Sequence, residues 1–467
     1  MTSTSSLSRR DWLCRTACGF GALALHDLVR AAQSPLALRS PQFPAKAKRV
    51  IFLFMSGGPS QPDLFDPKDY IRRMHGKTIS APINTNELRV GTDKFLALAT
   101  QREVRPRGQS GMRISDLLPH TASIADEICL LRAMHSDNNQ HQPAALQFHT
   151  GITADVRPSM GSWISYGLGT ENQNLPSFIT IHPDSDTRLY GSGFLPAAHQ
   201  GTKIVIPQGD KQPPIDYLSD ASGNSSVQRL RLDFVQRMNR RLLQQAEVDA
   251  RMEGMIESME MAFRMQSATP ELVDISSESE ATKKLYGVGE KVTDKNARAC
   301  LLARRLSEAG VRFVQVTMGG WDHHGDIRNA LPNSCAASDQ PCAALVKDLR
   351  SRGLLEDTLV IWSGEFGRTP WSQDLSGTSQ IEKHGREHQP ESFCTWMAGG
   401  GIKGGFTFGE TDDFGFRPVS GKVHLHDLHA TILHQLGLDH EKLTWRSMGR
   451  DFRLTDVYGN VVKEILA

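Results

Sequence analysis

Several carboxylate and imidazole side chains stand directly after short apolar runs that are typical of buried strands. Glu365 follows the run 358–362, Thr-Leu-Val-Ile-Trp, and Arg368 comes three residues later. Asp322-His323-His324 comes soon after the run 311–317 in the same way. Asp, Glu and His are side chains that hold divalent metals such as zinc and manganese. The pattern indicates a metal site suited to activating an anionic ester, whose oxyanion Arg368 would neutralise bidentately.

Three histidines follow another apolar run, which spans residues 128–134. They are His135, His141 and His149. Imidazole groups are costly to bury unless they are hydrogen-bonded or bind a metal. For each histidine alone a structural role is the commoner case, but the group as a whole favours membership of a site.

His388 and Asp63 complete the set of candidates. His388 lies in the charged loop Lys-His-Gly-Arg-Glu-His-Gln-Pro, and Asp63 lies in a Gly/Pro-rich turn after the first apolar run. An aspartate in such a turn is more commonly a surface residue. Glu365 and Arg368, taken alone, fit a surface ion pair as well as they fit a site. Their occurrence together with the other candidates favours the site.

The elements that must position these side chains form a parallel sheet with helices between its strands. Short, mostly apolar runs of this length are typical of strands buried on both faces. The predicted strands span residues 49–55, 128–134, 175–181, 311–317, 358–362 and 393–397. Open α/β sheets bind ligands beyond the carboxyl ends of their strands, which is where the candidates fall.

Residues from about 185 to 300 look like an insertion of loops and helices into this pattern. A glycine-rich stretch is followed by a long helical segment, 227–265, in which Leu230, Phe234 and Met238 recur at four-residue steps. The arginines between them fit a solvated helix face better than a cofactor or nucleic-acid contact.

Composition argues against nucleic acid as a partner. The 467 residues carry 53 basic and 52 acidic side chains, for a net charge of +1, so no global field favours nucleic acid or a membrane surface. Hydrophobic residues make up 39% and charged residues 22% of the chain, as in an ordinary globular protein. No run in the mature region approaches the roughly 18 apolar residues of a transmembrane helix.

The amino terminus carries a twin-arginine signal pattern, Ser-Arg-Arg-Asp-Trp-Leu at residues 8–13, ahead of a weakly apolar segment. A chance basic pair before a short helix is the alternative. The pattern predicts a signal and linker over residues 1–40, export by the twin-arginine machinery, and one domain over 41–467. In an oxidising compartment Cys335 and Cys342, expected in a loop, are close enough in sequence to pair.

Six motifs make the chain resemble, over essentially its whole length, the domain-of-unknown-function 1501 family, which belongs with the alkaline-phosphatase and sulfatase superfamily. They are the twin-arginine start, FMSGGPSQPDLFDPK, GGWDHHGD, TLVIWSGEFGRTP, GREHQP and HDLHATILHQLGLDHEKLTWRSMGRDF. The resemblance implies an alkaline-phosphatase-like three-layer sandwich, with a large mostly parallel sheet and helices on both faces. It also implies a metal site at the carboxyl edge of the sheet.

The resemblance also implies roles for individual residues. Asp322 and His324 are similar to an Asp/His pair that binds one metal. Glu365 stands where superfamily members have the aspartate of an S-D-H-G motif, and His388 is similar to a late metal-binding histidine. The aspartates usual directly after the first strand are absent here, so Asp63 would substitute from further away.

The chain also departs from the sulfatase pattern at the nucleophile. Sulfatases carry C-x-P-S-R about ten residues ahead of a Thr-Gly, and here His141 takes the cysteine position while Ala145 takes that of the arginine. A formylglycine mechanism needs Cys or Ser and is unavailable at His141. Three alternatives follow: His141 is a ligand or nucleophile, catalysis uses metal-bound water, or the site has drifted.

Two functional hypotheses follow. The first is an exported, periplasmic or extracellular, metal-dependent hydrolase of sulfate or phosphate esters, sulfated glycans among them. Its metal ligands would be Asp63, Asp322, His324, Glu365 and His388, with His141 as base or nucleophile and Arg368 as anion clamp. Mixed Asp/Glu/His ligation suits zinc or manganese better than magnesium or calcium. The second is a non-catalytic exported binding or scaffold protein that retains the fold.

Overall fold

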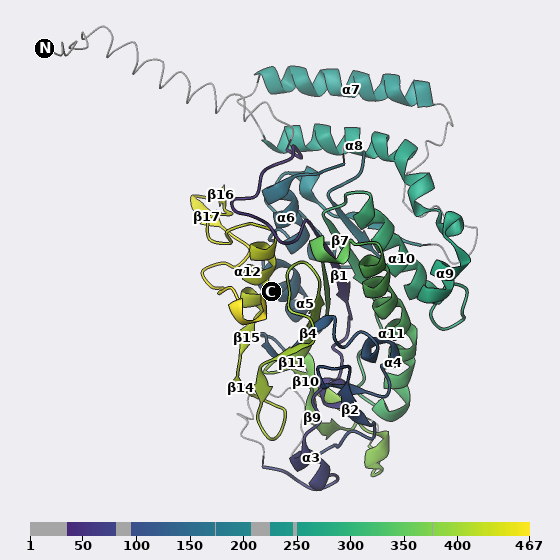
Figure 1. Cartoon of the computed structure of the whole chain (residues 1–467). Helices are drawn as coiled ribbons and strands as arrows, with labels where there is room; N and C mark the ends of the chain where they lie inside the picture. Colours follow the sequence, from purple (N-terminus) through teal and green to yellow (C-terminus); the bar gives the residue numbers. More distant parts are fainter. Residues whose placement is uncertain (1–34, 81–94, 173, 207–224, 246–249, 376) are drawn as a thin grey trace, which may run out of the picture.

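A computed structural model describes residues 35–80, 95–172, 174–206, 225–245, 250–375 and 377–467 (Figure 1). The proposed twin-arginine signal lies outside these residues. In the described part of the chain, the central feature is a nine-stranded sheet with the order β12-β4-β11-β8-β1-β7-β5-β6, and β15 pairs with β4 beside this path. Its strands are β1 (Arg49–Phe54), β4 (Ile128–His135), β5 (Phe178–Ile181), β6 (Thr202–Ile204), β7 (Phe313–Thr317), β8 (Thr358–Ser363), β11 (Phe393–Ala398), β12 (Phe406–Phe408) and β15 (Val423–His424).

The sheet is mostly parallel. β1 pairs in parallel with β7 and β8, and β5 pairs in parallel with β6 and β7. β11 is antiparallel to both β4 and β8, so β4 runs in the same direction as β8. The carboxyl ends of β1, β4, β5, β7 and β8 therefore lie at one edge of the sheet.

Helices cover both faces of this sheet, and the residues of β1 show why. Val50, Phe52 and Phe54 belong to one buried cluster, whereas Ile51 and Leu53 belong to another. Because successive side chains of a strand point to opposite faces, an all-apolar strand must be covered on both sides. The three-layer α/β architecture predicted from the sequence is thus confirmed.

The first cluster, with Val50, packs against α5, α6 and α12, and the second packs against α10 and α11 (Figure 1). The helices of the described residues are α2 (Gln61–Leu64), α3 (Asp69–Arg73), α4 (Pro119–Ala122), α5 (His141–Thr150), α6 (Met160–Leu168), α7 (Ser225–Gln245), α8 (Ala250–Val273), α9 (Glu280–Tyr286), α10 (Asp294–Glu308), α11 (Ile327–Ser351) and α12 (Leu425–Gln435). Within the ranges described, no helix is long and apolar enough to span a bilayer.

Four short antiparallel pairs of strands lie outside the main sheet in the described residues. They are β2 (Val104–Arg107) with β3 (Met112–Ser115), β9 (Gly367–Gln373) with β10 (Gly385–Gln389), β13 (Glu410–Thr411) with β14 (Pro418–Ser420), and β16 (Trp445–Ser447) with β17 (Arg450–Phe452). The β9–β10 pair follows β8 and places His388 opposite Arg368. It thereby brings a histidine back to the carboxyl edge of the main sheet.

The predicted pairing of Cys335 with Cys342 is wrong. Both cysteines lie inside α11 as buried free thiols. Seven residues of helix rise by about 10 Å, which exceeds the span that a disulfide can bridge.

Candidate metal centre

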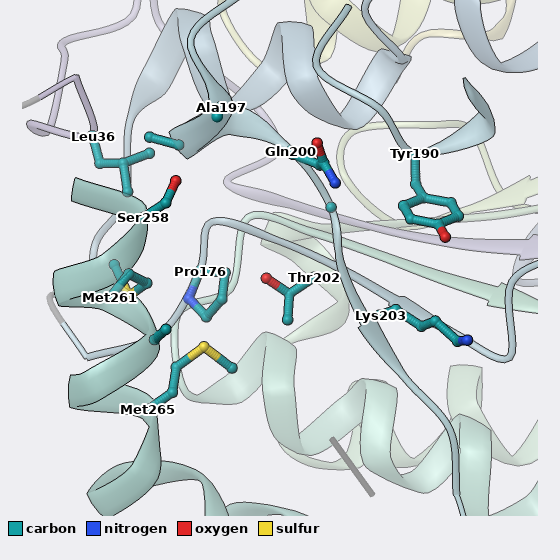
Figure 2. Close-up of a pocket in the computed structure, with 13 residues that line it drawn as sticks. Leu36, Pro176, Tyr190, Ala197, Gln200, Thr202, Lys203, Ser258, Met261 and Met265 are labelled. Carbon is teal, nitrogen blue, oxygen red and sulfur yellow. The ribbon is translucent and has the colours of Figure 1, made fainter. Parts of the chain in front are cut away.

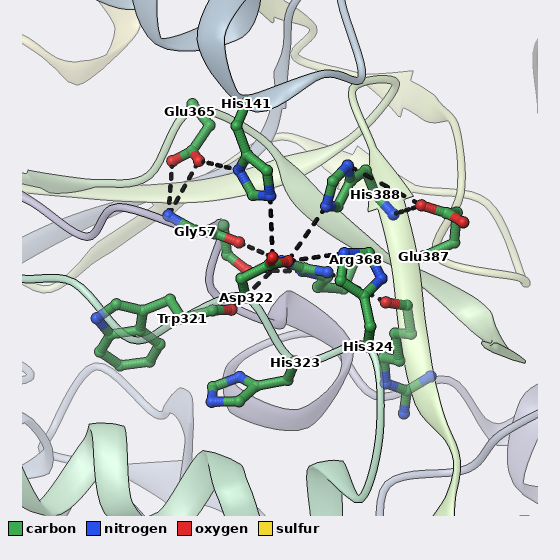
Figure 3. Close-up of polar contacts among 12 residues, drawn as sticks. Gly57, His141, Trp321, Asp322, His323, His324, Glu365, Arg368, Glu387 and His388 are labelled. Atoms are coloured by element: carbon green, nitrogen blue, oxygen red, sulfur yellow. Dashed lines mark hydrogen bonds and ion pairs between the residues drawn. The ribbon is translucent and has the colours of Figure 1, made fainter. Parts of the chain in front are cut away.

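Asp322 is the centre of a cluster of side chains beyond the carboxyl ends of the strands (Figure 3). The Nε2 atoms of His324 and His388 lie 2.8 and 3.3 Å from its Oδ1. The Nε2 atom of His141 lies 3.2 Å from its Oδ2. One ligand atom from each of these four residues falls within 4.8 Å of the others, a spacing compatible with a single metal ion.

Three separate segments supply these four side chains. Asp322 and His324 follow β7, His141 is the first residue of α5 after β4, and His388 lies on β10. These residues are up to about 250 positions apart in the sequence. We expected them to converge because parallel strands end at the same edge of a sheet. The structure brings these four together.

Each histidine of the cluster has its Nδ1 atom tied to an acceptor. His141 Nδ1 donates to Glu365 Oε1 at 2.7 Å, and His388 Nδ1 donates to the backbone oxygen of Asn139 at 2.7 Å. His324 Nδ1 donates to Gln373 Oε1. Carboxylate and carbonyl oxygens only accept, so they fix the proton on Nδ1 and leave Nε2 as the ligand atom.

The orientation of the Gln373 amide is itself determined. Its Nε2 donates to the carboxylate of Glu387, which can only accept, so the Oε1 atom must face His324. Glu387 in turn accepts a hydrogen bond from the backbone N–H of His388 at 2.9 Å. Glu387 therefore links Gln373, which accepts from His324, to the backbone of His388. Hydrogen-bond partners of this kind orient imidazoles that bind a metal.

A cation fits the point where the three Nε2 atoms converge. With protons on Nδ1, these atoms direct lone pairs at the carboxylate of Asp322, an arrangement that needs positive charge between them. His141 Nε2 is buried and makes no hydrogen bond among the described residues, because its approach to Asp322 lacks hydrogen-bond geometry. Three imidazole nitrogens and one carboxylate form a donor set typical of zinc and related metals.

The electrostatics of the cluster also favour a cation. Burial raises the pKa of Asp322, but its contacts with three histidines and Arg368 outweigh this effect and hold the pKa well below its usual range. Burial likewise opposes protonation of His141, yet the carboxylates of Asp322 and Glu365 raise its pKa to about 9. Burial lowers the pKa of His388. The carboxylates of Asp322 and Glu365 thus favour positive charge at this point, whether on His141 or on a cation.

Glu365 stands behind His141 rather than inside the group of four. Its Oε1 and Oε2 atoms accept from the backbone N–H of Gly57 at 2.9 and 3.1 Å, and Oε1 also accepts from His141. The side chain is buried. The sequence predicted Glu365 as a ligand, whereas its contacts suit a residue that orients the imidazole of His141.

Gly57 allows this close approach. Its φ of +119° is rare for residues with a side chain, and a Cβ atom there would lie 2.5 Å from the backbone nitrogen of Asp322. The glycine turn after β1 therefore packs directly beneath Asp322 while its N–H holds Glu365.

Arg368 is turned into the protein rather than toward a substrate. It is fully buried, its Nε donates to Gly58 at 3.0 Å, its Nη1 to Arg386 at 3.1 Å, and its Nη2 to Asp322 Oδ1 at 2.6 Å. The structure thus gives Arg368 a role in positioning Asp322, in place of the anion clamp expected from the sequence.

Asp63 lies outside the cluster. Both of its oxygens are occupied by Arg386, whose Nε and Nη2 atoms lie at 2.8 and 3.0 Å, and Ser60 adds a third donor. Asp63 therefore stabilises β10, which carries His388, and we leave it out of the proposed ligand set.

Three neighbouring histidines do not join the cluster. His323 points away from Asp322 and contacts Ser334 at 3.1 Å (Figure 3). His149 is buried against Phe54, and His135 packs beside His424. Of the histidines at residues 135, 141 and 149, the structure places only His141 at the site.

Sequence reasoning missed Ser56 and Asp184. Ser56 follows β1 and donates to Asp184 Oδ2 at 3.0 Å, and Asp184 follows β5. Burial raises the pKa of Asp184, and the charge of Glu365 adds to the effect, which also shows that the two carboxylates are near each other. The position of Asp184 just after the predicted strand 175–181 was the signal in the sequence that could have identified it as a candidate.

The family described as "Protein of unknown function (DUF1501)" matches residues 47–466. The chain belongs to this family. Because the match spans almost the whole chain, the site residues from Ser56 to His388 all lie within the family's domain. No curated protein matches the chain.

Solved structures that resemble this DUF1501 chain do so distantly. The lipoteichoic acid synthase LtaP from Listeria monocytogenes is 10% identical over 90% of this chain and 78% of its own, with a TM-score of 0.38. The sulfatase PsFucS1 from Pseudoalteromonas sp. is 14% identical over 86% and 69%, with a TM-score of 0.35. The alkaline phosphatase from the Antarctic bacterium TAB5 is 11% identical over 85% and 99%, with a TM-score of 0.30.

Replacing Glu365 by Gln is expected to weaken metal binding by roughly 10- to 100-fold, as loss of an outer partner typically does. The amide keeps the size of the side chain but offers His141 a weaker, neutral acceptor. Metal titration followed by calorimetry measures the change. Glu356→Gln, on the surface turn before β8, is the matched control and should leave affinity unchanged. Equal affinities for Glu365→Gln and the wild type would remove Glu365 from the site.

Proposed function

We propose that this protein is an exported metal-dependent hydrolase of sulfate or phosphate esters. The observation that carries the proposal is the convergence of three Nε2 atoms, each with its Nδ1 tied to an acceptor, on the carboxylate of Asp322. We assign the metal-ligand role to His141, Asp322, His324 and His388. Export rests on the twin-arginine pattern at residues 8–13.

The donor set supports zinc or manganese as the resident ion. Imidazole nitrogens suit zinc and other transition metals, whereas magnesium and calcium prefer sites made wholly of oxygen. A divalent cation held here would act as a Lewis acid toward an ester oxygen and promote ionisation of water. Of the three alternatives left by its place at the sulfatase cysteine position, this proposal adopts a ligand role for His141.

Asp184 and Ser56 supply groups for proton transfer beside the cluster. Asp184 accepts the hydroxyl proton of Ser56 in a hydrogen bond, and its raised pKa suits a group that takes up and releases a proton. We assign Asp184 the role of proton acceptor at the Ser56 hydroxyl. Arg368 holds Asp322 in place through a hydrogen bond, and its buried positive charge favours the ionised form of the Asp322 carboxylate.

Asp184→Asn is expected to lower kcat by about 100-fold, the usual contribution of a general acid or base, while metal content stays at the wild-type level. The substitution keeps the hydrogen bond from Ser56 but removes the proton acceptor. The exposed Asp155→Asn serves as the control and should leave both quantities unchanged. A normal kcat in Asp184→Asn would exclude this role.

The proposed function is tested with aryl phosphate and aryl sulfate esters. Protein stripped by a chelator should be inactive and should regain turnover of one ester class when zinc or manganese is restored. A fully metal-loaded protein that turns over neither class would contradict the hydrolase proposal and favour the exported binding or scaffold protein. A sulfated oligosaccharide then tests whether the anionic ester belongs to a glycan.

A further inference from the structure

Helix α7 has its polar side turned toward the molecule and its apolar side turned outward. It lies alongside α8 at the end of the structure distant from β9 and β10 (Figure 1). Gln236 is only 2% exposed, and its Nε2 donates to the backbone oxygen of Ile256 on α8 at 3.3 Å. Arg229 forms ion pairs with Asp233 on its own helix and with Glu260 on α8. Polar contacts thus attach α7 to α8.

The outward side of α7 is a stripe of large apolar side chains. Leu230, Phe234 and Met238 are 65%, 61% and 49% exposed, and they recur at four-residue steps along one side of the helix. Val235 extends the stripe and is 40% exposed. An ordinary surface helix buries its apolar stripe against the core, so this orientation is the reverse of the usual one. A contiguous exposed apolar stripe marks an interaction surface.

The orientation of α7 follows from the way α8 attaches to the body. Met261 and Met265 of α8 are buried and line a cavity of about 570 Å³ whose other walls include Pro176, Tyr190 and Thr202 (Figure 2). Because one side of α8 packs against the main α/β domain, α7 packs on the other side of α8. Rotating α7 to bury Phe234 would break the contacts of Gln236 and Arg229.

The charges of α7 indicate what its outward side contacts. The helix has five arginines and one aspartate among its 21 residues. Arg231, Arg237 and Arg241 are exposed. Large apolar side chains bordered by arginines are the pattern of a helix that lies in the interface of a negatively charged bilayer.

We propose that α7 binds the surface of an anionic lipid bilayer, with Leu230, Phe234 and Met238 inserted among the acyl chains. The three exposed arginines contact the lipid headgroups. A second copy of the chain fits the stripe less well, because a two-fold pairing of α7 would bring two arginine-rich helices face to face. The protein would thereby work at a membrane surface rather than free in solution, independently of the chemistry at Asp322.

The test is co-sedimentation of the full chain with vesicles of phosphatidylcholine alone or with one third phosphatidylglycerol. Wild-type protein should bind the anionic vesicles and lose binding as salt is raised. Leu230→Ser combined with Phe234→Ser should lower the partition coefficient at least tenfold. Arg231→Gln with Arg237→Gln and Arg241→Gln should lower it similarly and flatten the salt dependence.

The control exchanges two exposed apolar residues elsewhere, Leu375→Ser with Val419→Ser, and should bind as the wild type does. All variants should keep the circular dichroism spectrum and thermal unfolding midpoint of the wild type, which shows that they are folded. Equal vesicle binding by Leu230→Ser/Phe234→Ser and wild type would overturn the proposal, since binding would then come from another segment. A dimer in sedimentation equilibrium that this variant dissociates would instead assign the stripe to a second copy.

Discussion

Asp322→Asn is expected to abolish stable metal binding and, with it, ester hydrolysis. Asp322 is the one carboxylate within the group of four, and every other ligand faces it. Asparagine retains the shape but removes the negative charge that three imidazoles and Arg368 surround. The loss in metal affinity should exceed the roughly 10- to 100-fold that an outer partner contributes. Metal analysis after dialysis and turnover of the aryl esters measure the two effects.

Asp326→Asn provides the matched control. Asp326 lies four residues away in the same loop, contacts Asn329, and has a φ of 43° that asparagine adopts readily. Its variant should keep full metal content and activity. Retention of a tightly bound metal in Asp322→Asn would show that the ion sits elsewhere, whatever the activity.

Asp63→Ala is expected to lower the free energy of unfolding by about 3–5 kcal/mol, because it leaves the charge of Arg386 buried without a partner. Asp63 and Arg386 are both buried and form a bidentate pair. Chemical denaturation measures the loss. Asp63→Leu combined with Arg386→Met should be less destabilising than Asp63→Ala, since the double change removes both charges. Equal stability of Asp63→Ala and wild type would contradict this account of the pair.

The ion pair of Asp63 and Arg386 also makes the free energy of unfolding depend on pH in the acid range. Burial opposes ionisation of Asp63, but the charge and hydrogen bonds of Arg386, with help from Ser60, lower its pKa below the ordinary value. A lowered folded pKa gives a stabilisation that is complete above the unfolded pKa of about 3.9 and is lost as pH falls toward the folded value. The acid-unfolding curve of the double variant should therefore lack this component.

The strands that build the site could be predicted because their sequences carry local signals. β1, β4, β7 and β8 are mostly apolar runs whose side chains are largely buried on both faces. Helix α11 spans Ile327–Ser351, although the sequence indicated a loop around Cys335 and Cys342. Pro332 and Pro341 interrupt its helical pattern, and proline normally ends a helix. Buried contacts along its length outweigh that local cost, which no short window of sequence shows.

The site could be predicted as a set of residues but not as a set of roles. His141, Asp322, His324 and His388 were found by residue type and by position after strands. The acceptors that orient His324 and His388 are a glutamine and a backbone oxygen, which have no recognisable signal. Whether an arginine faces a ligand or the core depends on backbone carbonyls from segments far away in the sequence. Such carbonyls, from Gly58 and Arg386, accept hydrogen bonds from the buried Arg368.

The most direct test of the central claim is the metal content of the purified full-length protein, measured by mass spectrometry against protein concentration. We expect close to one zinc or manganese ion per chain, and we expect His141→Ala, His324→Ala or His388→Ala to reduce that content. A protein that folds normally but holds well below one divalent ion per chain, even after incubation with zinc or manganese, would contradict it.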